Sequence, residues 1–274
     1  MNTEINISNF VNAFFDTIKI QKTHPLQKYF SIERFFDGLQ KDKSTFQEPK
    51  NWDDPFEDFI SKLQNNNKNA YVSGLNITKG IYAQSWISKK SECDGMWRNF
   101  ASLDDGVLIY TKAESIIESL FQYLIDIGTF DDNNHFKGRF DIQQQLKGSI
   151  DLRKVKYVQD KDIATLFTQK TESPHLDYNE VSLNLLSKKR KEFEYENEYR
   201  LFVKQELLKL PNDKYLELGY LTRIIDKIVF SPLMSEEKVC HYRKKLILEY
   251  HFKEEQVSKS NLYNIDAFRQ EYNL

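Results

Sequence analysis

Hydrophobic residues recur at helical intervals in several segments of the chain. In the first segment, Ile7, Phe10, Phe14 and Ile18 lie three or four positions apart, which predicts an amphipathic helix over residues 4–20. Ser31 stands where an N-cap is expected, directly before the next such segment. Helices are predicted over residues 4–20, 32–39, 55–64, 114–127, 181–193 and 235–251, with one or two helical turns over 93–101.

Short runs rich in β-branched and aromatic residues alternate with these helices and predict strands. They are expected over residues 27–31, 80–88, 106–111, 155–158, 195–203, 216–218 and 224–230. No repeat is visible, and this mixed order predicts an α+β fold with a mixed or antiparallel central sheet flanked by helices. We expect a helical segment over residues 1–26, then one α+β domain over 27–274, with a family-like core over 27–232 and C-terminal helices over 235–274. The polar stretch 128–150 is predicted to be an exposed insertion or a mobile flap.

Composition narrows the class of protein. Of the 274 residues, 40% are hydrophobic, which is enough apolar material to exclude disorder as the global state. Lys and Arg number 39 against 41 Asp and Glu, so the net charge of −2 supplies no overall field for a nucleic acid. Cys93 and Cys240 form neither a disulfide framework nor a zinc motif, which favours a reducing compartment. No export signal or membrane span is visible, so a cytoplasmic location is expected.

Several common catalytic motifs are absent from the sequence. The nine glycines never fall at the spacing of a dinucleotide-binding fingerprint or of a P-loop. The sequence also lacks HExxH, GxSxG and an EF-hand loop, and its five histidines lack the short paired spacing of a helical metal site. The sequence therefore gives no support to metal or triad hydrolase chemistry, and no metal cofactor is expected.

The segment FEYENEYRLFV carries the most informative charged pattern. On a strand, Glu196, Glu198 and Arg200 would share one face at spacings of about 7 Å, so that Arg200 could pair with Glu198 and leave Glu196 to act separately. One carboxylate could stabilise an oxocarbenium ion while the other orients or deprotonates the attacking group. Side-chain alternation predicts that Tyr199 and Leu201 are buried and that Glu196, Glu198 and Arg200 face a cleft or solvent. The alternative to a catalytic role is a solvated strand face with a cross-strand ion pair.

An acidic cluster before the predicted helix 55–64 has a structural explanation. Asp54 fits the N-cap, Pro55 the first helical position, and Glu57 the reciprocal position of a capping box. We therefore expect Asp54 to accept the backbone N–H of Phe56 or Glu57. A metal nuclease that uses Asp53, Asp54, Glu57 and Glu196 is a weaker alternative, because the cap accounts for most of these residues.

Two further clusters have a structural and a functional interpretation each. Met96, Trp97 and Phe100 have helical spacing and are expected in the core, although they could also form a stacking platform for a base or nicotinamide. The basic run at residues 188–191 is expected to complement a helix dipole at the end of helix 181–193, or to form a local anion patch.

The order of the motifs is more informative than any one of them. The chain reads KYFSIERF, WDDPFED, IYAQSWIS, MWRNFASLDDGVLIY, VKYV, FEYENEYRLFV and IIDKIVFSP. This succession resembles a bacterial family known as domain of unknown function 2971, and the resemblance covers residues 27–232. The chain departs from the family pattern at Asp53, at Phe100, at Ser231 and at the run 83–86, which replaces Cys-Phe-Ser.

The same order is similar to that of ADP-ribosyltransferases, which hold NAD without a glycine-rich loop. The resemblance implies that Lys28 or Tyr29 contacts the phosphates or ribose and that Ser85 shapes the nicotinamide pocket. It also implies that Glu198 holds the ribose hydroxyl and Glu196 prepares the acceptor. Trp97 and Arg200 complete the expected cofactor-binding set.

Two functions follow as expectations. The first is an NAD-consuming, ADP-ribosyltransferase-like effector that acts on a macromolecule or on water, as a toxin or in phage defence. The second is a non-catalytic module that recognises a protein or nucleic acid and has a regulatory role beside a partner encoded by a neighbouring gene.

Overall fold

The computed structural model describes residues 6–52, 54, 56, 78–89, 91–129, 146, 149–162, 178–206, 208–211 and 213–272. The chain divides into two compact units, each of which is described by itself. The first unit comprises Met1–Ile20, Thr45–Trp86 and Ile125–Glu217, and the second comprises Gln21–Ser44, Ile87–Leu124 and Leu218–Leu274. The domain boundary expected at residue 26 stays a prediction.

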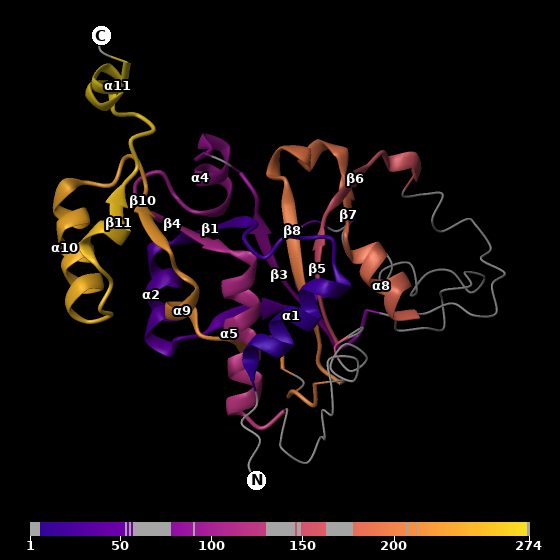
Figure 1. Cartoon of the computed structure of the whole chain (residues 1–274). Coiled ribbons are helices and arrows are strands. Elements are labelled where there is room, and N and C mark those ends of the chain that lie inside the picture. Colours follow the sequence, from indigo (N-terminus) through magenta and orange to yellow (C-terminus); the bar gives the residue numbers. More distant parts are fainter. Residues whose placement is uncertain are drawn as a thin grey trace. The chain divides into compact units, whose positions relative to one another are not determined.

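The first unit is built on strands from distant parts of the sequence. Its strand order is β5-β8-β3-β2-β9. Figure 1 labels β3 and β5 on either side of β8. A separate parallel pair joins β6 to β7. The elements are α1 (Ile7–Thr17), β2 (Ser44–Gln47), η1 (Pro49–Asn51), β3 (Ile81–Ile87), β5 (Ile150–Lys154), β6 (Lys156–Val158), α8 (Tyr178–Leu186), β7 (Lys188–Arg190), η2 (Lys191–Glu196), β8 (Glu198–Lys204) and β9 (Tyr215–Leu218).

One face of this sheet is apolar at one end and charged at the other. Ile81 and Ala83 of β3 and Phe202 of β8 pack against Leu183 and Leu186 of α8. Because side chains alternate along a strand, the next residues on that face of β8 towards its start are Arg200 and Glu198. The sheet therefore positions these charged side chains beside an apolar core.

The second unit has the strand order β11-β10-β4-β1, with a parallel β10–β11 pair and antiparallel pairs elsewhere. Two of its helices begin at serine caps: the Ser31 side chain accepts the Arg34 N–H, and the Ser235 side chain accepts the Lys238 N–H. The elements are β1 (Pro25–Ser31), α2 (Ile32–Lys41), α4 (Asp94–Phe100), β4 (Gly106–Lys112), α5 (Ala113–Asp126), α9 (Leu221–Ile224), β10 (Lys227–Phe230), α10 (Glu236–Leu248), η3 (Glu254–Gln256), β11 (Val257–Lys259) and α11 (Ile265–Tyr272).

The predicted α+β class is confirmed, since a mixed, mostly antiparallel sheet is flanked by helices. In the described part of the chain, no helix is long and apolar enough to cross a membrane. The predicted helix 55–64 and most of the stretch 128–150 lie outside the described residues. The strands β2, β5 and β11 were not predicted, because they are short and lack a distinctive alternation.

Two boundaries near the charged motif were wrong. The predicted helix 181–193 ends at Leu186, where the Ser187 hydroxyl donates to the Leu183 carbonyl, and the basic run continues as strand β7. The basic run therefore follows the end of α8 as a strand and is not part of the helix.

The predicted strand 195–203 begins only at Glu198, because residues 191–196 form the 3-10 helix η2. Asn197, at a φ of 47°, makes the turn between η2 and β8, a conformation that asparagine tolerates better than most residues. The predicted strand 224–230 likewise begins at Lys227, because α9 occupies residues 221–224.

Candidate functional site

Lys189, Glu196, Glu198 and Arg200 form one connected cluster in the first unit, called here the charge network. Arg200 Nε donates to Glu198 Oε1 at 2.7 Å, and its Nη2 donates to Oε2 at 2.9 Å. Lys189 Nζ donates to Glu196 Oε2 at 2.7 Å and lies 3.5 Å from Glu198 Oε2. The two glutamates of the motif are thus joined through Lys189.

Arg200 is held in place from three sides. Besides Glu198, its Nη1 donates to the carbonyl of Leu186 at 2.6 Å, where a cation complements the C-terminal end of α8. Its guanidinium lies 4.4 Å from the ring centroid of Trp52. Arg200 is only 1% exposed, so these contacts replace water around a buried charge.

Glu198 is ionised despite its burial. Burial alone would raise the pKa of the Glu198 carboxyl, but Arg200, Lys189 and a hydrogen bond from Ser85 outweigh it and lower that pKa. The backbone N–H of Glu198 donates to the hydroxyl oxygen of Tyr157 at 2.8 Å. The site therefore contains a fixed negative charge.

Ser85 is the exposed member of this group. It lies on β3 between the buried Gln84 and Trp86, and its hydroxyl bonds the Glu198 carboxylate. The buried carboxylate therefore has a hydrogen-bond partner, the Ser85 hydroxyl, that solvent and ligands can reach. Sequence reasoning had named both residues, and the structure brings them together.

The motif face was predicted to face a cleft or solvent, and the solvent alternative is wrong. Glu196, Glu198 and Arg200 are 3%, 4% and 1% exposed, so their ion pairs are buried. The buried residues Tyr199 and Leu201 on the other face agree with the prediction. Strand alternation separates two faces but does not say which one is covered, and here α8 and Trp52 cover the charged face.

Asp54 makes the contact predicted for it, because the Phe56 N–H donates to Asp54 Oδ1 at 3.0 Å. The same oxygen lies 3.6 Å from Arg190 Nη2, and Arg190 lies over the ring of Phe56 at 4.3 Å. Asp53 and Glu57 lie outside the described residues. Across the described ranges, no three His, Cys, Asp or Glu side chains are placed to hold a metal ion.

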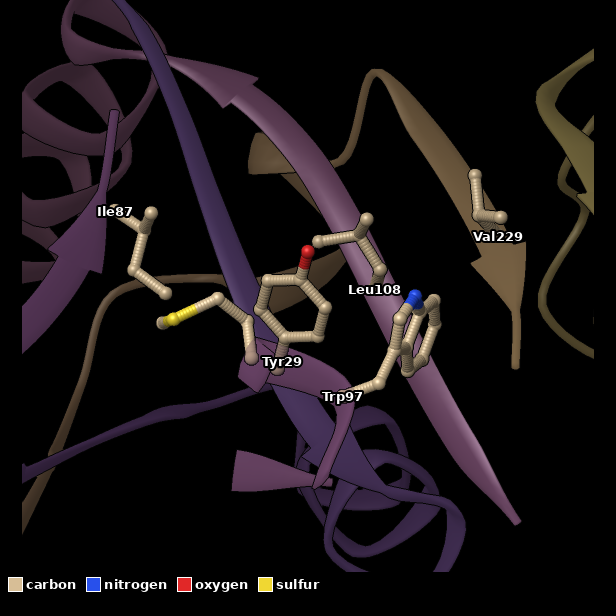
Figure 2. Packing of buried hydrophobic residues seen from close by; sticks show 6 residues of the cluster. Tyr29, Ile87, Trp97, Leu108 and Val229 are labelled. Atoms are coloured by element: carbon tan, nitrogen blue, oxygen red, sulfur yellow. The ribbon is translucent and has the colours of Figure 1, made fainter. Parts of the chain in front are cut away.

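Lys28, Tyr29 and Trp97 belong to the second unit. Tyr29 and Trp97 meet edge to face, with ring centroids 4.9 Å apart, over Leu108 of β4 (Figure 2). Trp97 has no exposed surface, and its Nε1 donates to Glu92 Oε2 at 3.1 Å.

The core interpretation is therefore confirmed for Met96 and Trp97, while Phe100 is 46% exposed and lies outside this core. Burial raises the pKa of the Tyr29 phenol. Lys28 is half-buried, with its Nζ 5.8 Å from the ring centroid of Phe30.

Sequence reasoning missed Trp52, Tyr157 and Lys189 as parts of the site. Trp52 stacks on Arg200, Tyr157 holds the backbone of Glu198, and Lys189 bridges the glutamates. All three lie in segments that the sequence had singled out for other reasons: WDDPFED, VKYV and the basic run. The available signal was the order of these segments along the chain, which resembles the family pattern. That order contains no information on distances between side chains.

Comparison with curated proteins and with solved structures gave no match, and nothing in the comparisons supports the resemblance to ADP-ribosyltransferases. Residues 96–201, which include Trp97, Tyr157 and most of the charged motif, match the model of the family described as "Protein of unknown function (DUF2971)", which supports the resemblance to that family.

Proposed function

We propose that this chain is an NAD-consuming, ADP-ribosyltransferase-like effector that acts on a macromolecule or on water, as a toxin or in phage defence. One observation carries the proposal: the exposed hydroxyl of Ser85 bonds the ionised, buried carboxylate of Glu198. A ligand hydroxyl that reaches Glu198 beside Ser85 would meet a fixed negative charge, which the Ser85 hydroxyl holds in position.

The chemistry needs a charge of this kind. When the bond between nicotinamide and ribose breaks, its electron pair leaves with the nicotinamide nitrogen and positive charge develops on the ribose. A preorganised carboxylate stabilises that charge without reorganising water. Glu198 would hold the ribose hydroxyl in this reaction. Glu196 would receive the proton of the attacking acceptor, and Lys189 would hold Glu196 in position.

A second candidate function is a non-catalytic module that recognises a protein or nucleic acid beside a partner from a neighbouring gene. The observation that favours it is the internal pairing of the network, since Arg200 bonds both oxygens of Glu198 and Lys189 bonds Glu196. A carboxylate held in this way is a weak base. The two candidates differ in whether NAD is turned over.

The burial of the network decides which variant tests the proposal. Glu198→Gln removes the charge that neutralises Arg200, so a loss of activity could follow from a loss of folding. Ser85→Ala is the cleaner change, because Ser85 is exposed. Thr45→Ala is the matched control, since Thr45 is an exposed hydroxyl residue on β2 in the same unit.

Nicotinamide release from NAD is measured for the wild type and both variants, with cell extract present and thermal melting as the control. Ser85→Ala is expected to lower the rate by roughly tenfold or more, the effect of one hydrogen bond to a charged group, at an unchanged melting temperature. Thr45→Ala keeps the wild-type rate. Absence of turnover in the wild type, or an equal rate in Ser85→Ala, would leave the recognition module as the better description.

A further inference from the structure

A pocket with a volume of about 330 Å³ lies beside the charge network, within the first unit. It is lined by Lys154, Val155, Lys156, Tyr157, Glu194 and Asn197. The volume falls within the range of small-molecule sites, which begins at about 300 Å³. Five of the six lining residues come from the segments VKYV and FEYENEYR, and Lys154 directly precedes VKYV, so two motifs that are distant in sequence meet here.

The cations at this pocket lack carboxylate partners. Lys154 and Lys156 are exposed, and neither they nor Lys188 form an ion pair with any residue that the structure describes. Lys188 pairs directly with Lys156 across the parallel β6–β7 ladder, which places two like charges on one face. Like charges in this position destabilise the pair unless an anion lies between them.

Nearby carboxylates do not neutralise this group. Glu180 lies within the field of Lys156, but Arg153 binds it through two hydrogen bonds of 3.0 and 2.5 Å. Burial and the charge of Lys156 lower the pKa of Lys188. Glu194 is the one carboxylate among the six lining residues. The contrast is with Lys189 in the same strand, whose charge Glu196 neutralises at 2.7 Å.

Tyr157 lines the pocket, but its side chain lies on the other face of β6 from Lys156, on the face of Lys189 and the charge network. Its hydroxyl oxygen accepts the Glu198 N–H, so its own hydrogen points elsewhere, and no described residue accepts it. Burial raises the pKa of the phenol, with the charges of Glu198 and Glu196 adding to the effect, and this keeps the hydrogen in place. The two ammonium groups of Lys154 and Lys156 are charged donors of the kind that bind an oxyanion.

We propose that this pocket binds the phosphate group of a small phosphorylated molecule of nucleotide size, with Lys154 and Lys156 as donors to the phosphate oxygens. Lys188 adds to the positive field, and the Glu194 carboxylate accepts a hydroxyl of the same ligand. The proposal is independent of NAD turnover, because binding a phosphate requires no reaction at Glu198.

Isothermal titration calorimetry of the full chain at constant ionic strength tests the proposal with three probes: inorganic phosphate, ADP and adenosine. Inorganic phosphate and ADP are expected to bind saturably with one site, ADP more tightly, and adenosine much more weakly than ADP. Lys156→Gln and Lys154→Gln should each weaken ADP binding roughly tenfold or more, because each removes a charge-assisted hydrogen bond. Both lysines are exposed, so the variants keep the fold.

Lys79→Gln is the matched control, since Lys79 is an exposed lysine of the same unit that does not line the pocket. It should bind ADP as the wild type does. The proposal is overturned if neither phosphate-bearing probe binds, if adenosine binds as tightly as ADP, or if Lys79→Gln weakens binding as much as Lys156→Gln. A protein that binds ADP but releases no nicotinamide would contradict the proposed function alone.

Discussion

The charge network of the first unit and the cluster around Trp97 in the second are both buried, yet they are stabilised differently. The cluster of Tyr29, Ile87, Met96, Trp97, Leu108 and Val229 is held by apolar contact, which is non-directional and proportional to area. The network is held by ion pairs whose attraction only offsets the cost of removing charges from water. The stability of the Trp97 cluster therefore depends on how well the side chains fill space. The stability of the charge network depends on each charged side chain having its partner.

The largest difference should appear when one partner of the network is removed without changing its shape. Glu198→Gln keeps the volume of the side chain but takes away the charge opposite Arg200 and Lys189. We expect the free energy of unfolding to fall by about 3–5 kcal/mol, the usual cost of breaking a buried ion pair. Urea denaturation followed by circular dichroism measures it. A loss below about 1 kcal/mol would mean that the pair behaves as an exposed one.

The pH dependence of stability sharpens the same comparison. Glu198 has a lowered pKa in the folded state, so its stabilising contribution is complete above the unfolded pKa of about 4.3. That contribution is lost as the pH falls through the lower folded value, because the unfolded chain then binds the proton first. We expect wild-type stability to decline steeply below about pH 4, as measured by thermal melting.

In Glu198→Gln this part of the decline should be absent, since the variant has no proton to bind at this position. Asp151, whose pKa is raised by burial, is present in both proteins and cancels from the difference. Parallel curves for the two proteins between pH 5 and pH 2 would contradict the assignment of the acid transition to Glu198.

The same contrast explains what the sequence could predict. Apolar periodicity identified α1, α2, α5 and α10 and placed Trp97 in the core, because an apolar side chain identifies its own environment. Charge does not. Glu198 and Arg200 were expected to face a cleft or solvent because charged strand residues usually pair with water, and only the tertiary contacts with Trp52 and α8 remove the water.

Local chain geometry was the second feature that the sequence did not predict. Lys189 was assigned to a helix because lysine and arginine favour helices, whereas pairing with β6 makes it a strand residue. The 3-10 turn that ends at Asn197 shifts the start of β8 by three residues from its predicted position. The pocket beside it depends on this turn, so no sequence pattern could have identified it.

The Trp97 cluster should tolerate a change that conserves volume, in contrast to the network. Met96 is fully buried, and Met96→Leu replaces one flexible apolar side chain by another of similar size. We expect the free energy of unfolding to change by less than about 1.5 kcal/mol, because apolar contact does not depend on a particular partner atom. The measurement is the same urea titration. A loss as large as that of Glu198→Gln would show that the cluster is as specific as the ion pairs.

The smallest effect is expected at Asp54, which lies beside both a backbone donor and a cation. Asp54→Ala removes the bond to the Phe56 N–H and should cost about 1 kcal/mol, the typical value of such a contact. Asp54→Asn separates the two roles, because an amide oxygen still accepts the N–H but carries no charge for Arg190 at 3.6 Å. If the backbone bond dominates, Asp54→Asn melts with the wild type. If it melts with Asp54→Ala instead, the charge matters more than the turn, and Asp54 belongs with the charge network.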